Sequence, residues 1–309
     1  MSISAPPHSE LTIIITRDYK CTAASESYDD FLAALQGLST QQFESDFNIM
    51  IVVGPGDATE ITEVTSERFG AKLDVQIIEG PSDRAIDQRN YAYNHVKSRF
   101  VLDMDADCVL HPRCLTHLLA AMHSSESVGV VSAITSYGDD SSWRRIASLF
   151  DRPYGHLQSL APTTYLSANC ALFRRELLLE HKLRAGPPFT ISRSRTEGLI
   201  SSGVGLFVEP RAIAYHAHNG LKFCHDYHRS AGFAWMYTHP SPQYGLIPNY
   251  VVRTLWRDLR LALRQGPRRL HWRDWLLVPA VVLMSRYYRV LGMFDALRGE
   301  PRAVGTGFV

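Results

Sequence analysis

Three aspartates lie at alternate positions in the stretch FVLDMDADCVLHP, which runs from Phe100 to Pro112. They are Asp103, Asp105 and Asp107. Side chains two positions apart along an extended chain point to the same face. Like charges this close repel one another, and burying them without partners is costly in free energy. The spacing therefore predicts a positive charge nearby, and a divalent cation is the simplest candidate.

An Asp-x-Asp sequence at the end of a strand is suited to bind a hard cation together with the diphosphate of a nucleotide. Carboxylate oxygens ligate Mg²⁺ or Mn²⁺, and the metal can bridge the diphosphate oxygens. A solvated turn, whose aspartates cap the following helix, is the competing interpretation. The two interpretations differ in whether a cleft or bulk solvent lies beside the aspartates.

The segments around these aspartates alternate between strand-like and helix-like patterns. Continuous apolar runs predict strands at 11–16, 47–53, 73–78, 100–104 and 128–134. Helices are predicted at 28–38, 59–69 and 84–98, and another after His111-Pro112. This alternation predicts an α/β fold with a mostly parallel sheet flanked by helices on both faces. Ligands bind outside the carboxyl ends of such strands, which is where the aspartates fall.

The order of motifs resembles that of the family 2 glycosyltransferases, which have the GT-A fold. The resemblance covers about Leu11 to Gly232 and rests on the stretches IIITRD, IVVGPGDATEIT, QRNYAYNHVKSRFVLDMDADCVLHP, YLSANCALFRREL and GLFVEPRAIAYH. The third stretch is the most specific, because Arg89-Asn90 and the Asp-x-Asp lie at the family's usual separation. The resemblance implies a Rossmann-like GT-A sheet and transfer of a sugar from a nucleotide-diphosphate donor.

The resemblance also implies roles for individual residues at the metal. Asp105 contacts the ribose or the metal, Asp107 ligates the metal, and Asp103 has no implied role. His216 matches a closing histidine that in some members completes the metal coordination, and imidazole suits Mn²⁺ better than Mg²⁺. A hydrogen-bonded histidine at a strand end is an equally good interpretation of His216.

Three further residues are implied to bind the nucleotide-sugar. Thr16 lies along the nucleotide, and Arg89 pairs with the pyrophosphate or with the aspartates. Arg229 lies on a helix that flanks the diphosphate and carries a basic residue ahead of a glycine, here Gly232.

Two departures from the family pattern affect recognition of the donor nucleobase and the identity of the catalytic base. Gly54 stands where the family has an aspartate that contacts the nucleobase, so the sequence leaves the donor base open. The family's Glu-Asp pair is missing from FTISRSRTEGLISSGVG, where Glu197 is the one carboxylate. Because an acceptor hydroxyl must lose a proton as it attacks, Glu197 is the candidate catalytic base. A glutamate that interacts with the dipole at a helix start is the alternative.

The composition changes after about Pro240, which predicts a catalytic domain at 1–240 and a helical C-terminal extension at 241–309. From Val251 onward the chain has eleven arginines and four acidic residues. Arg253, Arg257, Arg260 and Arg264 form one stripe of a helix, with Val252, Leu255, Leu259 and Leu263 expected on the opposite side.

The extension predicts contact with a membrane surface rather than a span. The apolar run WLLVPAVVLM is about half the length that a single span needs. Tryptophans and arginines fit a helix that lies at headgroup level. A helix packed on the catalytic domain with solvated arginines is the alternative, and no nucleic-acid motif accompanies the charge.

The sequence thus predicts a metal-dependent, inverting glycosyltransferase. Its partners are a nucleotide-diphosphate sugar and a hydroxyl acceptor, which is a glycan, a lipid-linked precursor or a secondary-metabolite precursor. Five scattered cysteines without a C-x-x-C pair, and a start that lacks signal-peptide features, predict a cytoplasmic location on the inner face of the membrane. The alternative is a GT-A-like protein that binds nucleotide-sugar without turnover.

Overall fold

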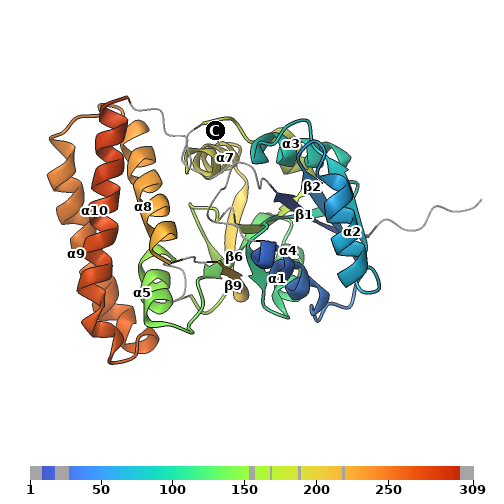
Figure 1. Ribbon diagram of the computed structural model, residues 1–309, viewed down its shortest axis with the longest axis horizontal. Helices are drawn as coiled ribbons and strands as arrows, with labels where there is room; N and C mark the ends of the chain where they lie inside the picture. The colour runs from blue at the N-terminus through green and yellow to red at the C-terminus, as the bar shows by residue number, and fades with distance from the viewer. Residues whose placement is uncertain are drawn as a thin grey trace, which may run out of the picture.

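A sheet of nine strands forms the centre of the larger part of the molecule (Figure 1). The structure is a computed structural model, and it describes residues 9–17, 28–152, 157–167, 169–186, 189–217 and 220–299. The strands are β1 (Leu11–Arg17), β2 (Phe47–Val53), β3 (Val75–Glu79), β4 (Phe100–Asp105), β5 (Cys108–Leu110), β6 (Val128–Ser136), β7 (Ala161–Pro162), β8 (Cys170–Arg174) and β9 (Gly205–His216). Their order is β3-β2-β1-β4-β8-β6-β9-β5, with β7 paired to β9.

The half of the sheet that carries the Asp-x-Asp sequence is parallel, as expected. β1 pairs in parallel with β2 and β4, and β2 pairs in parallel with β3. The register places Thr16 opposite Asp105, so the carboxyl ends of β1 and β4 meet at one edge. β8 lies between β4 and β6 and runs antiparallel to both, which the apolar runs did not predict. A short run such as β8 carries too little periodicity to reveal its direction.

Helices cover both faces of the sheet because successive strand residues point to opposite sides. On one face Ile13 and Ile15 pack with α1 (Tyr28–Ser39), α2 (Ala58–Phe69) and α4 (Cys114–His123). On the other face Ile14 packs with α3 (Ala85–His95), α6 (Arg175–Glu180) and α7 (Thr190–Ser201). These layers fix the strands whose ends carry the aspartates.

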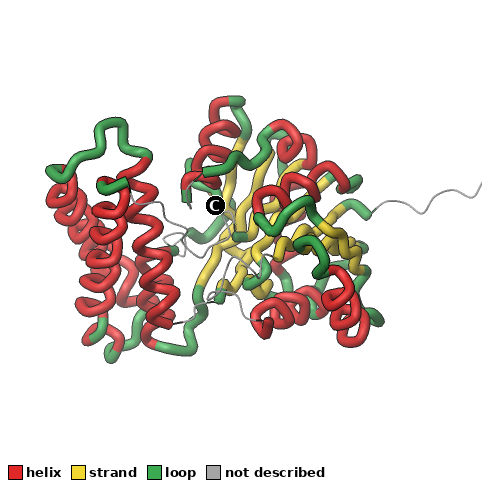
Figure 2. The backbone as a smooth tube through the Cα atoms, turned by 45° about the horizontal axis from the view of Figure 1, so that its top comes forward, coloured by secondary structure: helices red, strands yellow, loops and turns green. Residues whose placement is uncertain are grey.

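The C-terminal helices form a separate layer at one end of the molecule (Figure 2). They are α8 (Gly220–Tyr237), α9 (Leu246–Arg269) and α10 (Val278–Leu297), and α5 (Ser142–Asp151) packs against α9. Two glycines allow α8 and α10 to approach closely. A Cβ at Gly232 would collide with the Arg289 carbonyl, and one at Gly292 with the Arg229 carbonyl. The domain boundary near Pro240 stays a prediction, since α8 shares this layer with α9 and α10.

The C-terminal layer buries charges between its helices and neighbours. The carboxylate of Asp258 on α9 accepts hydrogen bonds from the buried Arg286 on α10. Asp274, between these helices, is fully buried and accepts two 2.8 Å bonds from Arg145 on α5.

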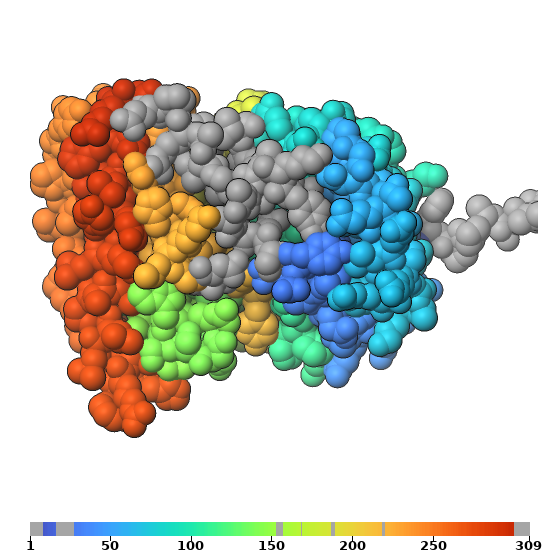
Figure 3. All heavy atoms as spheres, viewed as in Figure 1, coloured from blue at the N-terminus to red at the C-terminus, as the bar shows by residue number. Residues whose placement is uncertain are grey.

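The outer surface of the same layer is apolar as well as basic. Val252 is 66 % exposed, Leu263 is 64 % exposed and Trp272 is 72 % exposed. The apolar stripe of α9 is therefore exposed to solvent, and its place opposite the arginines stays a prediction. Figure 3 shows α9 and α10 at one end of the molecule. None of the described helices is long and apolar enough to cross a membrane.

Candidate active site

The acidic cluster forms where β4 ends and the chain turns back into β5. Asp105 ends β4, Asp107 lies in the turn, and Cys108 pairs with His216 of β9. This pairing brings the imidazole Nδ1 to 3.4 Å from an Asp107 oxygen and Nε2 to 3.9 Å from an Asp105 oxygen. One ligand atom from each of these four residues lies within 4.8 Å of the others. The turn thus collects two carboxylates and an imidazole from two strands.

Three residues hold the Asp105 carboxylate in place. Arg89, on the buried side of α3, donates to one oxygen, and Asn169 donates to the other. Arg89 also donates to the Thr16 hydroxyl at 3.1 Å, which joins β1 to the same group. The predicted residues Thr16, Arg89, Asp105, Asp107 and His216 therefore lie together at one edge of the sheet.

Asp103 points to the same face as Asp105 but belongs to the core. Its carboxylate accepts hydrogen bonds from Tyr93 at 2.7 Å and from Arg195 at 3.2 Å. Arg89 lies 3.5 Å from its other oxygen. Arginines therefore supply the predicted positive charge beside Asp103 and Asp105. Among the described residues, no arginine forms a hydrogen bond with Asp107.

The pKa values of the two outer carboxylates are shifted in opposite directions. Burial disfavours the charged form of Asp105, but Arg89 and the bond from Asn169 outweigh it and hold the pKa below its ordinary value. For Asp107, burial and then the charge of Asp105 raise the pKa well above its ordinary value. Burial, and next the charge of Arg152, lower the pKa of His216 to about 4. The imidazole is thus neutral near pH 7, as metal ligation requires.

The cluster fits a divalent cation better than a purely structural network. The Oδ1 atom of Asp107 is buried and has no hydrogen-bond partner among the described residues. Such an atom is costly unless something binds it. Two carboxylates and an imidazole suit Mn²⁺ or Mg²⁺, whereas the thiol of Cys108 is a soft ligand and belongs to the core.

A cavity of about 370 Å³ adjoins the cluster, between β6, α5, α8 and α9. Arg152, on its wall, donates at 3.2 Å to Asn169, which in turn bonds to Asp105. The guanidinium of Arg152 also lies over the ring of Tyr137, whose edge meets His216. The remaining charged lining residues are Asp151, Arg257 and Arg289.

Two predicted residues lie elsewhere. Glu197 is 61 % exposed and accepts a 2.7 Å bond from Arg193. Arg193 also donates to Thr238, just beyond the far end of α8. Because α8 is 18 residues long, that end is about 27 Å from the end that follows His216. The structure does not bring Glu197 to the cluster.

Arg229 lies on α8 as expected, but its guanidinium is directed at α10. It donates to both oxygens of Asp295, at 2.8 Å and 3.0 Å. The structure thus places Arg229 in the contact between helices rather than with the aspartates.

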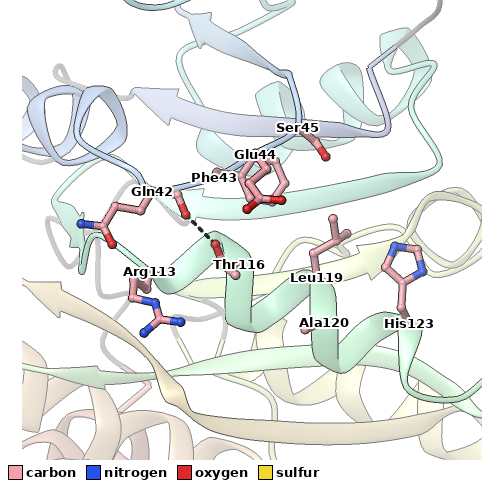
Figure 4. A pocket seen from close by; sticks show the side chains of 9 residues that line it. All are labelled: Gln42, Phe43, Glu44, Ser45, Arg113, Thr116, Leu119, Ala120 and His123. Carbon is pink, nitrogen blue, oxygen red and sulfur yellow. Dashed lines mark hydrogen bonds between the residues drawn. The ribbon is translucent and has the colours of Figure 1, made fainter.

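A second hollow lies on the opposite edge of the sheet (Figure 4). This groove of about 580 Å³ runs between α4 and residues 42–45, which precede β2. Its His123 pairs with Glu10, just before β1, so the groove lies at the amino ends of the strands. Ligands of parallel sheets bind at the carboxyl ends, which favours the acidic cluster over this groove.

Sequence reasoning missed several residues of the site. Asn169 lies in the quoted stretch YLSANCALFRREL, but a lone asparagine gives no signal until β8 is placed beside β4. Asp151 and Arg152 lie outside every motif. Asp83 was also missed: a Cβ at Gly54 would collide with its carboxylate. A carboxylate from the loop after β3 therefore occupies the space beside Gly54.

Comparison with known proteins agrees with this geometry. Residues 26–181 match the family model described as "Glycosyl transferase family 2". No curated protein matches the chain.

Two solved structures match the chain over most of its length, and the first, with the higher TM-score, has a similar fold. One is the mannosyltransferase PcManGT from Pyrobaculum calidifontis in complex with GDP-Man and Mn²⁺, at 14 % identity and a TM-score of 0.60, covering 96 % of this chain and 89 % of that one. The other is S. aureus TarS 1-349 in complex with UDP-GlcNAc, at 12 % identity and a TM-score of 0.47, covering 93 % and 89 %.

Proposed function

Because the chain belongs to glycosyl transferase family 2, we propose that it transfers a sugar from a nucleotide-diphosphate donor to an acceptor hydroxyl, with a divalent cation as cofactor. The observation that carries this proposal is the buried, unpartnered oxygen of Asp107 beside Asp105 and a neutral His216. PcManGT, which has a similar fold, was solved with GDP-Man and Mn²⁺.

The roles of the residues follow from their places. Asp105, Asp107 and His216 would hold the cation, which would supply positive charge for the diphosphate leaving group. Arg89 stays cationic, because the charges of Asp103 and Asp105 raise its pKa despite burial. Arg89 and Thr16 orient Asp105 at the end of β4. The family resemblance predicts inversion at the anomeric carbon.

Ligand-dependent thermal stability tests the donor and the cation together. A ligand that binds the folded state raises its stability with the logarithm of concentration. We expect GDP or UDP to raise the melting temperature in the presence of Mn²⁺ and not in the presence of EDTA. Asp107→Asn should abolish the metal-dependent part while leaving the unliganded melting temperature within a few degrees. Stabilisation by a nucleotide that is indifferent to Mn²⁺ would contradict the cation site.

Binding without turnover is the second candidate function, favoured by the absent Glu-Asp pair. An assay for slow hydrolysis of GDP-mannose or UDP-N-acetylglucosamine in the presence of Mn²⁺ distinguishes a transferase from a binding protein. Release of nucleoside diphosphate that Asp107→Asn eliminates supports catalysis, whereas donor binding without any release supports the binding protein.

We also propose that the C-terminal layer lies on a membrane surface, on the inner face of the cell membrane. Its exposed face combines Trp256, Leu259 and Leu263 with neighbouring arginines. Arg260 lies over the Trp256 ring at 4.9 Å, which keeps a cation and an amphipathic ring together. Apolar side chains among arginines suit a surface of anionic lipids, and this contact would bring a lipid-linked acceptor close to the cavity.

A further inference from the structure

Resting on the proposed transfer reaction, we infer that Asp151 is the catalytic base that accepts the proton of the acceptor hydroxyl. Asp151 is the last residue of α5, and its side chain is 5 % exposed. It lines the cavity beside the acidic cluster, and among the described lining residues it alone carries a carboxylate.

The acceptor is assigned to this cavity because its wall is linked to the acidic cluster. Through Arg152 and Asn169, its wall is two hydrogen bonds from Asp105. Phe189, which directly precedes α7, also lines the cavity. The start of α7 falls within the stretch that lacks the expected Glu-Asp pair. The helix end that should carry the base thus reaches the cavity without a carboxylate, and α5 supplies one from the neighbouring wall.

The surroundings of Asp151 favour an ionised carboxylate. Arg289 lies 3.6 Å from one oxygen, and His228 Nε2 lies 3.5 Å from the other. Arg289 donates to His228 Nδ1 at 3.2 Å, so a neutral His228 carries its proton on Nε2, toward Asp151. Both approaches are longer than the 2.7–2.9 Å typical of tight charge-assisted bonds. Arg152, Tyr137, Tyr227 and Cys224 also lie near enough to act on Asp151 electrostatically, and Arg257 lines the same cavity.

The step balances without another reactant. The acceptor oxygen forms a bond to the anomeric carbon while its proton passes to the Asp151 carboxylate. The bond from that carbon to the diphosphate oxygen breaks, and the electron pair leaves with the nucleoside diphosphate. Water can replace the acceptor, which makes donor hydrolysis a usable assay.

The test compares Asp151→Asn with Glu197→Gln, a matched carboxylate-to-amide change at the exposed glutamate. Hydrolysis of GDP-mannose or UDP-N-acetylglucosamine, whichever binds with Mn²⁺, is measured as kcat, together with donor affinity and melting temperature. We expect Asp151→Asn to lower kcat about 100-fold, in the range for a lost general base, with donor affinity and Mn²⁺ dependence unchanged. Glu197→Gln should leave kcat unchanged.

A pH profile distinguishes a base from an ion-pair anchor. With Mn²⁺ kept saturating at every pH, the wild-type rate should fall in acid as the carboxylate gains a proton, and Asp151→Asn should lose that limb while Asp151→Glu regains part of it. An unchanged kcat in Asp151→Asn, or a large loss in Glu197→Gln, would overturn the assignment. So would a parallel loss of donor affinity. A wild-type protein that binds donor but never releases nucleoside diphosphate would instead overturn the proposed catalysis, and with it the need for a base.

Discussion

At the scale of residues, neighbouring aspartates acquire different tasks from the groups that surround them. One oxygen of Asp103 accepts hydrogen bonds from Tyr93 and Arg195 and the other faces Arg89 at 3.5 Å, while Asp105 is fixed by Arg89 and Asn169. Asp107 accepts no hydrogen bond from an arginine among the described residues and retains a buried oxygen without a hydrogen bond. Burial and the charge of Asp105 raise its pKa, which favours the protonated form, so cation affinity should weaken as the solution is acidified.

The carboxylate beside Gly54 gives a prediction about donor recognition. Asp83 lies where a side chain at Gly54 would project, so it can accept a hydrogen bond from a nucleobase N–H group. We expect Asp83→Ala to weaken binding of the stabilising nucleoside diphosphate about tenfold, since one lost bond of this kind costs on the order of 1–3 kcal/mol.

The control for Asp83 is an aspartate at the other end of the same strand. Asp74 is exposed and precedes β3, so Asp74→Ala should leave affinity unchanged. Calorimetric titration of each variant with the nucleoside diphosphate, in the presence of Mn²⁺, measures the affinity. Equal affinities in Asp83→Ala and wild type would refute a role in recognising the base.

At the scale of elements, the turn between β4 and β5 builds the cluster because β5 pairs with the end of β9. The apolar runs predicted the five strands β1, β2, β3, β4 and β6, and the Asp-x-Asp spacing singled out both aspartates, because these are local signals. Thr16 and Arg89 were predicted from the family resemblance. The sequence could not identify Asn169, Asp151 or Asp83. Each is a single polar residue whose importance depends on which strand or helix lies beside it, and that pairing is long-range.

The placement of Glu197 and Arg229 shows the same limit. Both were chosen from their position along the chain, and each has a local or helix-to-helix partner that sequence does not reveal. The exposure of the apolar stripe on α9 shows a different limit. Spacing shows which residues share a face, but it does not show whether the core or the surroundings lie against that face.

The Arg145–Asp274 pair predicts how stability depends on pH. The hydrogen bonds from Arg145, opposed by burial, hold the pKa of Asp274 well below its ordinary value. A depressed pKa contributes stability above the unfolded-state value of about 3.9, and this contribution is lost as the pH falls toward the folded value.

Asp274→Ala should therefore lower the free energy of unfolding by about 3 kcal/mol at pH 7, since it leaves Arg145 without its partner. The gap between variant and wild type should narrow from about pH 4 downward. Urea unfolding at several pH values measures this difference in the free energy of unfolding. The control is Asp140→Ala, which removes an exposed partner of Arg144. A gap that is constant with pH would refute the ionic origin of the effect.

At the scale of the whole molecule, the C-terminal layer has charges inside and apolar side chains outside. Leu276 is 75 % exposed, and Arg273 lies over the neighbouring Trp272 ring at 5.3 Å. An aqueous protein gains little from this arrangement, whereas a lipid interface accommodates both kinds of side chain.

Vesicle binding tests this layer directly. The wild type should sediment with vesicles that contain phosphatidylglycerol more than with phosphatidylcholine alone, and less at high salt. Replacing Trp256, Leu263 and Trp272 with serine should weaken binding about tenfold or more without lowering the melting temperature, because all three side chains are exposed.

The control is Leu221→Ser, which removes an equally exposed leucine from the start of α8. Binding that the triple change leaves intact, or that ignores lipid charge, would count against the proposed surface.

The ion pairs Arg229–Asp295 and Asp151–Arg289 join α8 and α5 to α10. They also determine how short a fragment of the chain can be and still be active. Cutting the chain near Pro240 would keep the entire acidic cluster and the whole segment, residues 26–181, that matches the family. It would nevertheless remove Arg289, which contacts Asp151 and His228. It would also remove Asp295, which accepts hydrogen bonds from Arg229. It would also remove Arg257 and Leu261 from the cavity wall. A fragment chosen by homology alone should bind the nucleotide but should not transfer the sugar. We therefore expect the minimal active unit to extend through α10.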